Sequence, residues 1–178
     1  MYQEVIDFWF EESKPSQWWI KDEEFDQLIR DRFSEVHEKA SKCELFEWRE
    51  SPEGRLAEII VLDQFSRNMF RGTPKAFSQD PMALILAQES LSLGIDTRLE
   101  PRMRGFLYLP LMHSESLVIH EKAEAVYRQL GEPSGLEYEL KHKTIIQRFG
   151  RYPHRNEILG RDSTDEELEF LKQPGSSF

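Results

Sequence analysis

Proline near the start of a segment and glycine just past its end recur along this sequence, and they predict a chain of helices. Ser51-Pro52 opens one segment that Gly72-Thr73-Pro74 closes, and Asp80-Pro81 opens the next, which ends at Gly94. Proline suits the first helical position because its missing N–H has no helical partner there, and glycine tolerates the left-handed backbone that ends a helix. No segment alternates apolar and polar residues between turns, so we predict no sheet.

The rest of the chain repeats this punctuation. Two further segments end at Gly131 and Gly150, an earlier helix is expected from Asp22 to Lys42, and a capping box from Ser163 to Glu166 predicts a last helix. We predict an all-α fold of about seven to eight helices in antiparallel pairs, arranged as a tetratricopeptide-like stack. We expect one helical domain over residues 1–172 and a flexible tail over 173–178.

Composition excludes several classes of function. The formal net charge is −10, which opposes binding to nucleic acid, and Cys43 is the sole cysteine, so the chain has no internal disulfide and no Cys-x-x-Cys zinc pair. The longest apolar run, 106–112, is too short to span a bilayer, and the N-terminus lacks the basic start of a signal peptide. We expect a soluble, cytoplasmic protein with neither a nucleic-acid nor a membrane partner.

Two charged residues interrupt an apolar helical stripe. In the helix expected over 56–70, Asp63 and Arg67 occupy positions that should face the core, and their spacing allows them to pair with each other. An adjoining polar row contains Gln64, Asn68 and Arg71. Two interpretations fit this pattern: a buried ion pair that ties two helices together, or a wall that faces a ligand.

The stretch "RFGRYPHRNEILGRDST", 148–164, gathers four arginines and no lysine. A solvated basic surface usually mixes the two, whereas arginine alone favours two-pronged recognition of carboxylate or phosphate. The ligand-binding candidates here are Arg148, Arg151, Arg155 and Asn156, with His154 as a proton-transfer group. The alternative is that these arginines bind helix carbonyls and internal acids. His142, on an apolar helix face, is either a ligand contact or a core residue.

A shared spacing links the two regions. Phe65-x-Arg67-x-x-x-Arg71 matches Phe149-x-Arg151-x-x-x-Arg155. This match predicts two similar helix ends that face one cavity, or an old duplication.

A third segment, "YLPLMHSESL", places His113, Ser114 and Glu115 after Pro110, near an expected helix start. Helix N-termini favour anions, although Ser114 also suits a simple N-cap. If the three segments meet, His113, His154 and Asp63 are the candidate catalytic residues for proton transfer.

No cofactor is expected. The histidines lack the spacing of zinc enzymes, and nearby arginines would repel a metal ion. The aromatic groups at 8–10 and 18–19 favour core packing, with the flank of a cavity as the alternative.

Several long segments of the chain resemble the bacterial family called domain of unknown function 924. The resemblance runs through "DFWF", "LDQFSRNMFRGTPKAF", "YLPLMHSE" and "RFGRYPHRNEILGRDSTDEE" and covers nearly the whole length. It implies an all-helical, tetratricopeptide-like fold and carries no established activity. Ser66 and Tyr152 stand where other members often have proline and phenylalanine.

From the sequence we expect an arginine-rich polar pocket that binds a small carboxylate or phosphate metabolite. If the protein is an enzyme, the same pocket would turn this metabolite over. A first alternative is a helical-repeat interaction module that binds an acidic peptide or a C-terminal carboxylate. A second is an internal ion-pair network with no pocket.

Overall fold

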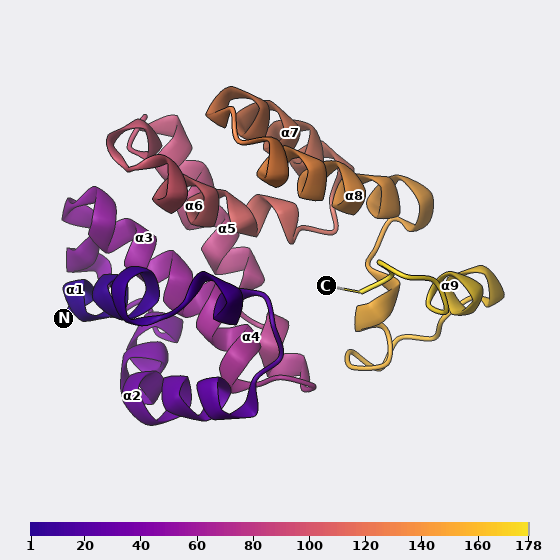
Figure 1. Ribbon diagram of the computed structural model, residues 1–178, viewed down its shortest axis with the longest axis horizontal. Helices are drawn as coiled ribbons and strands as arrows, with labels where there is room; N and C mark the ends of the chain where they lie inside the picture. The colour runs from indigo at the N-terminus through magenta and orange to yellow at the C-terminus, as the bar shows by residue number, and fades with distance from the viewer. Residues whose placement is uncertain (178) are drawn as a thin grey trace. The chain divides into compact units, whose positions relative to one another are not determined.

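The computed structural model describes residues 1–177, and its α-helices are labelled in Figure 1. Residues 1–177 contain no strand, so the all-α prediction is confirmed. Contacts between residues group the chain into two compact units. Unit 1 comprises Met1–Arg71 and Lys75–Pro110, and unit 2 comprises Gly72–Pro74 and the chain from Leu111 onward. The single domain over 1–172 and the tetratricopeptide-like stack stay predictions.

Unit 1 contains the first five α-helices and most of the sixth. Short 3₁₀ and π turns join them. The α-helices are α1 (Tyr2–Asp7), α2 (Glu23–Ser41), α3 (Pro52–Ile60), α4 (Ser66–Met69), α5 (Asp80–Ser92) and α6 (Pro101–Met112).

The expected start of α3 is confirmed. Pro52 is its first residue, and the hydroxyl of Ser51 accepts a hydrogen bond from the backbone N–H of Gly54 at 3.0 Å. The start of α5 differs from the expectation, because Asp80 lies inside the helix and Gln79 is the N-cap residue. The carboxylate of Asp80 accepts hydrogen bonds from Arg67 instead.

The continuous helix expected over 56–70 is interrupted by a π-helical turn at Val61–Phe65. Side chains cap two carbonyls of this turn: the Ser66 hydroxyl donates to Leu62 O at 2.6 Å, and Arg67 Nη1 donates to Asp63 O at 2.9 Å. A π turn shifts the backbone hydrogen bonds by one residue and occurs often at functional sites. It changes the face on which each residue of the segment lies.

The core of unit 1 is aromatic, as expected for residues 8–10. Phe8, Trp9 and Phe10 are all buried, and the Trp9 ring lies 5.6 Å from that of Phe65 between centroids. Trp19 departs from the core interpretation because 64% of its surface is exposed.

Unit 2 is built on a hairpin of two antiparallel helices, α7 (Leu117–Leu130) and α8 (Pro133–Phe149), which lie side by side in Figure 1. Gly131 and Gly150 end them with positive φ of 78° and 69°, as the sequence predicts. A non-glycine residue rarely adopts this left-handed backbone, so glycine stops each helix where it does.

The chain beyond Gly150 packs against α8. Ile145 and Ile146 form a buried core with Tyr152, and Phe149 and Phe170 cover it. This segment contains a 3₁₀ turn, Pro153–Arg155, and the short helix α9 (Asp165–Phe170). The capping box of α9 runs from Thr164 to Glu167, one residue later than predicted.

Two further expectations meet the structure only in part. No helix within residues 1–177 is both long and apolar enough to cross a membrane, while the cytoplasmic location stays a prediction. In the tail expected over 173–178, Ser176 is buried and donates to Leu171 O at 3.1 Å. Phe178 lies outside the described residues.

Candidate functional site

The charged residues that interrupt the stripe of unit 1 contact partners in the same unit. Arg67 Nη1 lies 3.2 Å from Asp63 Oδ1, and Arg67 also donates to both oxygens of Asp80 at 2.9 and 3.0 Å. Gln64 donates to Asp63 Oδ2 at 2.5 Å. Asp63 is only 1% exposed, so its charge has to be compensated by close partners. These contacts are those expected from the internal ion-pair interpretation.

Asn68 and Arg71 converge on a carboxylate that the sequence reasoning missed. Arg71 donates two hydrogen bonds to Asp26 at 2.6 and 2.8 Å, and Asn68 donates a third at 2.7 Å. Asp26 lies on α2 and is buried. Its spacing of three and seven residues from Ile29 and Phe33 places it on the apolar face of that helix, which is the signal that marks it.

Three arginines of the segment 148–164 form ion pairs within unit 2. Arg148 contacts Glu166 at 2.9 Å, and Arg151 donates to both oxygens of Glu167 at 2.7 and 2.8 Å. Arg161, which was not among the predicted site residues, holds the carboxylate of Glu115 with two bonds of 2.7 and 2.9 Å.

Glu115 ties the connection between α6 and α7 to the C-terminal segment. Besides accepting from Arg161, it accepts the backbone N–H of Tyr152 at 2.7 Å. Burial is the largest single influence on the pKa of Glu115 and acts to raise it, but the hydrogen bonds from Arg161 and from the Tyr152 N–H together outweigh burial and lower the pKa. Ser114 is not an N-cap, because α7 begins after Ser116.

Arg155 and Asn156 are both buried. Arg155 Nη2 donates to His113 O at 3.0 Å, and its guanidinium carbon lies 4.8 Å from the centroid of the Tyr152 ring. Asn156 donates to Ser163 Oγ and accepts from Arg161 Nε, both at 3.0 Å. The segments around 113–115 and 148–164 therefore meet, which fulfils part of the condition that three segments converge.

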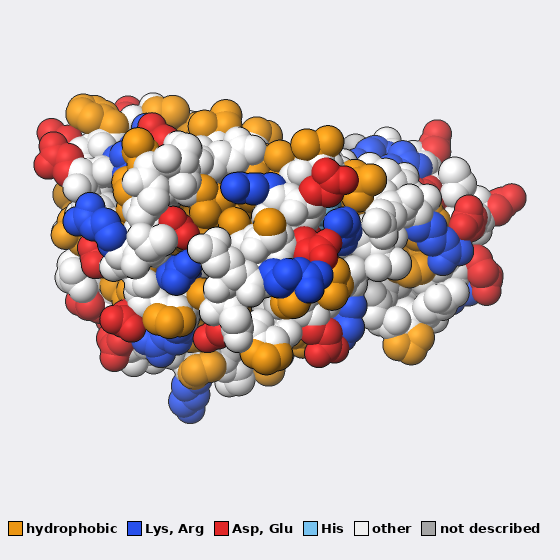
Figure 2. All heavy atoms as spheres, turned by 90° about the horizontal axis from the view of Figure 1, so that it is seen from above, with side chains coloured by type: hydrophobic (Ala, Val, Ile, Leu, Met, Phe, Trp, Pro, Cys, Tyr) orange, Lys and Arg blue, Asp and Glu red, His pale blue; other side chains and the backbone are white. Residues whose placement is uncertain are grey.

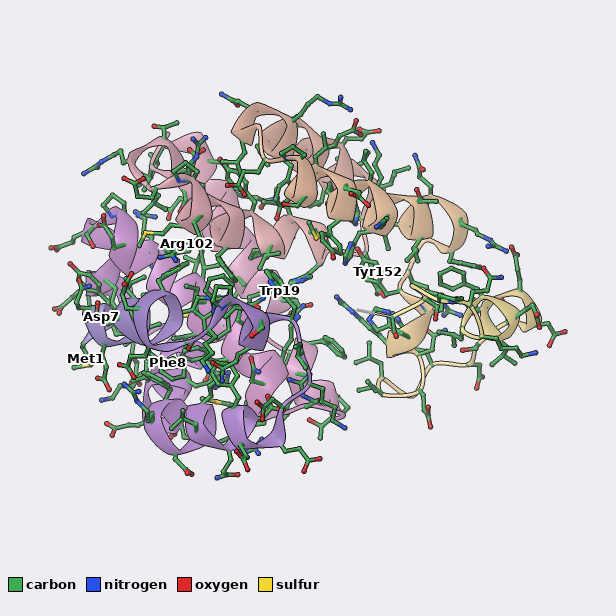
Figure 3. The ribbon with its side chains drawn as sticks, in the orientation of Figure 1. Met1, Asp7, Phe8, Trp19, Arg102 and Tyr152 are labelled. Carbon is green, nitrogen blue, oxygen red and sulfur yellow. The ribbon has the colours of Figure 1, made fainter. Side chains whose placement is uncertain are left out.

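Three of the five histidines gather around Tyr152. Tyr152 lies on the segment after α8 and is labelled in Figure 3. The centroids of the His120, His142 and His154 rings lie 6.3, 5.8 and 5.6 Å from that of Tyr152. His113 also belongs to the group, because its charge lowers the pKa of His142, as do the charges of His120 and His154. We call these four histidines, Tyr152 and Arg155 the histidine cluster.

His120 and Glu139 form a fully buried pair that the sequence reasoning missed. His120 Nδ1 lies 2.7 Å from Glu139 Oε1, and both side chains are 0% exposed. His120 Nε2 lies 2.8 Å from Ser114 O and 3.1 Å from the Tyr152 hydroxyl. Because a carbonyl oxygen only accepts, Nε2 carries a proton. Burial raises the pKa of Glu139, against the lowering effect of His120.

The tautomer of His142 is also fixed by its partner. Nδ1 lies 2.7 Å from Tyr138 O, so Nδ1 carries the proton and Nε2 carries the lone pair. Burial lowers the pKa of His142 to about 3, helped by the charges of His113, His120 and His154. His142 is therefore a neutral residue near pH 7, while Tyr138 on the same expected face is 55% exposed.

A spacing signal in the sequence marks the missed pair. His120 shares the buried face of α7 with Ala123 and Tyr127, three and seven residues on. Glu139 precedes His142 by three residues on α8, and both are buried. A polar residue at each of these apolar positions predicts that the two helices exchange hydrogen bonds.

The cluster has the chemical groups for anion recognition and proton transfer. Arg155 supplies a fixed positive charge, and the partly exposed His113 and His154 supply imidazole nitrogens. Within the described chain, no three His, Cys, Asp or Glu residues are arranged to hold a metal ion. Asp63 belongs to unit 1, so its expected convergence with His154 and Arg155 stays a prediction.

Fold and cluster define an all-helical protein with a histidine–arginine cluster around a buried tyrosine. A family model described as a bacterial protein of unknown function (DUF924) matches residues 5–175, and the chain belongs to this family. A solved structure, described as that of the protein of unknown function ATU0120 from Agrobacterium tumefaciens, is similar to it. The two are 38% identical over 96% of each chain, with a TM-score of 0.91. No curated protein matched the chain.

Proposed function

We propose that this protein binds a small anionic metabolite, a carboxylate or a phosphate, at the histidine cluster. The observation that carries the proposal is the gathering of three histidines and Arg155 around one tyrosine, with the charge of His113 acting on the same group, in a protein whose net charge is −10. On the face shown in Figure 2, acidic and basic side chains are interspersed, which is the ordinary pattern of a soluble surface. A localised group of cationic and titratable side chains gives an anion a defined site that such a surface does not.

His113 and His154 are the contacts we assign to the ligand. Both are half-buried, whereas His120 and His142 are buried. Arg155 supplies positive charge to the site, and its guanidinium is held by His113 O and by the face of the Tyr152 ring. An acid–base reaction of the bound metabolite would use His113 or His154 as the proton-transfer group.

The binding experiment uses the histidines themselves as reporters. We would record the imidazole C–H signals of the full chain by NMR while adding inorganic phosphate, sulfate or a dicarboxylate. We expect the signals of His113 and His154 to shift with one saturation curve. His37, which lies in unit 1 and contacts Ser66 at 2.8 Å, serves as the internal control. Equal, non-saturating shifts of all five histidines would overturn the proposal.

A pair of arginine variants tests the charge. Arg155→Lys should weaken binding by about ten- to a hundredfold, because hydrogen bonds to charged groups contribute roughly 1.5–3 kcal/mol and a lysine cannot reproduce the planar fork. Arg148→Lys is the matched control, because Arg148 is exposed and contacts Glu166 at the surface. Binding of an acidic peptide without binding of the small anions would favour the interaction-module alternative.

A further inference from the structure

The histidine cluster divides into two inner histidines and two outer ones. His120 donates from Nε2 to Ser114 O, and His142 donates from Nδ1 to Tyr138 O, so each inner ring has a proton fixed on one nitrogen. Neither inner side chain is more than 5% exposed. His113 and His154 are half-buried, so they are the more exposed members of the cluster.

Several elements of unit 2 contribute charged or titratable groups to the cluster and its surroundings. His120 comes from α7, while α8 contributes His142, Glu139 and Lys143. The connection between α6 and α7 contributes Glu115, which Arg161 holds. The C-terminal segment contributes Arg155, and also Arg151 with its partner Glu167.

The histidines of the cluster oppose one another's protonation, because their charges have the same sign. The charges of His113, His120 and His154 each oppose protonation of His142, and Arg155 adds a permanent positive charge beside His154 in sequence. A proton on one member therefore disfavours a proton on the next. A bound anion reverses this effect, because a negative charge close to an imidazole favours its protonated form.

We propose that the cluster binds its anion together with a proton, which His113 or His154 takes up as the ligand arrives. This inference rests on the proposed function and names its regulation: affinity rises as the pH falls through the histidine range. The ligand class it favours is an anion that accepts a hydrogen bond from imidazolium, such as a phosphate ester or a dicarboxylate.

Proton uptake is measured directly by calorimetry. The probe is inorganic sulfate, whose charge is constant between about pH 6 and pH 8, so that any proton taken up belongs to the protein. Titrations of the full chain in buffers of different ionisation enthalpy give the number of protons bound per anion. We expect uptake of about one proton at the upper end of this range, and an affinity that falls by about tenfold per pH unit where uptake is complete.

The outcomes separate the two proposals. Binding of sulfate without proton uptake, at an affinity independent of pH, overturns this inference and leaves the proposed function standing. No binding of sulfate, phosphate or dicarboxylate removes both.

Variants assign the proton to a residue. His113→Gln and His154→Gln each keep a polar side chain and remove the titration. We expect one of them to abolish proton uptake and to flatten the pH dependence of the affinity. His37→Gln, in unit 1, is the control and should retain both. Uptake that persists unchanged in the two single variants and in the double variant overturns the inference, provided that circular dichroism shows each variant folded.

Discussion

Glu139 on α8 and His120 on α7 lie with Oε1 2.7 Å from Nδ1, and both side chains are fully buried. Either His120 is charged beside a carboxylate, or both groups are neutral and Glu139 donates the hydrogen bond. In both forms one proton is shared between the helices. Nε2 of the His120 ring donates a hydrogen bond to Ser114 O. The pair therefore also anchors the connection between α6 and α7, which contains His113.

Removing one member of this pair should destabilise unit 2 strongly. Glu139→Ala leaves the buried Nδ1 of His120 without its hydrogen-bond partner, and loss of one partner from a buried pair costs about 3–5 kcal/mol. Urea unfolding followed by circular dichroism measures the loss. Glu137→Ala, on the exposed side of the same helix where Glu137 contacts Lys141, is the control and should change little. A Glu139→Ala protein as stable as its parent would show that the pair contributes no net stability.

The stability of unit 2 should decrease as the pH falls below about 6.5. His142 has an ordinary pKa of 6.5 when unfolded and about 3 when folded, because burial disfavours its charged form. The unfolded chain therefore binds the proton first, and folding loses up to about 1.4 kcal/mol per pH unit through this residue. Glu139 acts oppositely, since its raised pKa lets the folded state take up a proton before the unfolded one.

The variant that tests this pH dependence is His142→Leu, which fills the same buried site without titrating. Unfolding midpoints in urea, measured at intervals between about pH 7 and pH 5, should fall less steeply for the variant than for the parent. Parallel curves for the two proteins would assign the pH dependence to other groups.

A second acid transition should arise from Glu167. Hydrogen bonds from Arg151 lower the pKa of this carboxyl to about 2, from an ordinary value of 4.5. Its contribution to stability is therefore complete above about pH 4.5 and is lost as the pH falls toward 2. Glu167→Gln should lower stability at neutral pH and remove this part of the acid dependence. NMR measures the transition through signals of side chains in unit 2, such as the Phe170 ring protons, recorded as the pH is lowered.

Local backbone rules account for the parts of the fold that were predicted. Ser51-Pro52, Gly131 and Gly150 fix helix ends through groups within a few residues, so the sequence predicts them directly. The π turn at Val61–Phe65 was missed because its extra residue is accommodated by side-chain caps from Ser66 and Arg67. Such a turn has no local spacing signature.

The sequence marks part of the histidine cluster, while its role as a site stays a prediction. His113, His154 and Arg155 stood out because their segments hold unusual polar residues, and the structure joins Arg155 to His113 O and sets His154 against Tyr152. Which arginine holds which acid depends on the path of the chain after Gly150. Arg161 rather than Arg151 reaches Glu115, and only the tertiary structure determines that choice.

The cap on the π turn gives a prediction for unit 1. The Ser66 hydroxyl donates to Leu62 O and contacts His37 Nε2 at 2.8 Å, and Ser66 is 0% exposed. Ser66→Ala should cost roughly 1–3 kcal/mol, because it leaves two buried polar groups without this partner. Ser34→Ala is the matched control: Ser34 makes the same bond to the carbonyl four residues earlier, Arg30 O, on an exposed face. Equal losses in the two variants would contradict a special role for the π-turn cap.

Arg151→Lys separates the internal role of an arginine from a ligand role. Arg151 donates to both oxygens of Glu167 and also to Asp162 O at 2.8 Å, a set of contacts that one ammonium group cannot reproduce. We expect the thermal midpoint of Arg151→Lys to fall while its affinity for sulfate stays that of the parent. The reverse result, weaker binding at an unchanged midpoint, would move Arg151 from the ion-pair network to the ligand. Arg155→Lys, measured in the same two assays, should show the loss of affinity that Arg151→Lys lacks, because Arg155 lies against the Tyr152 ring at the centre of the cluster.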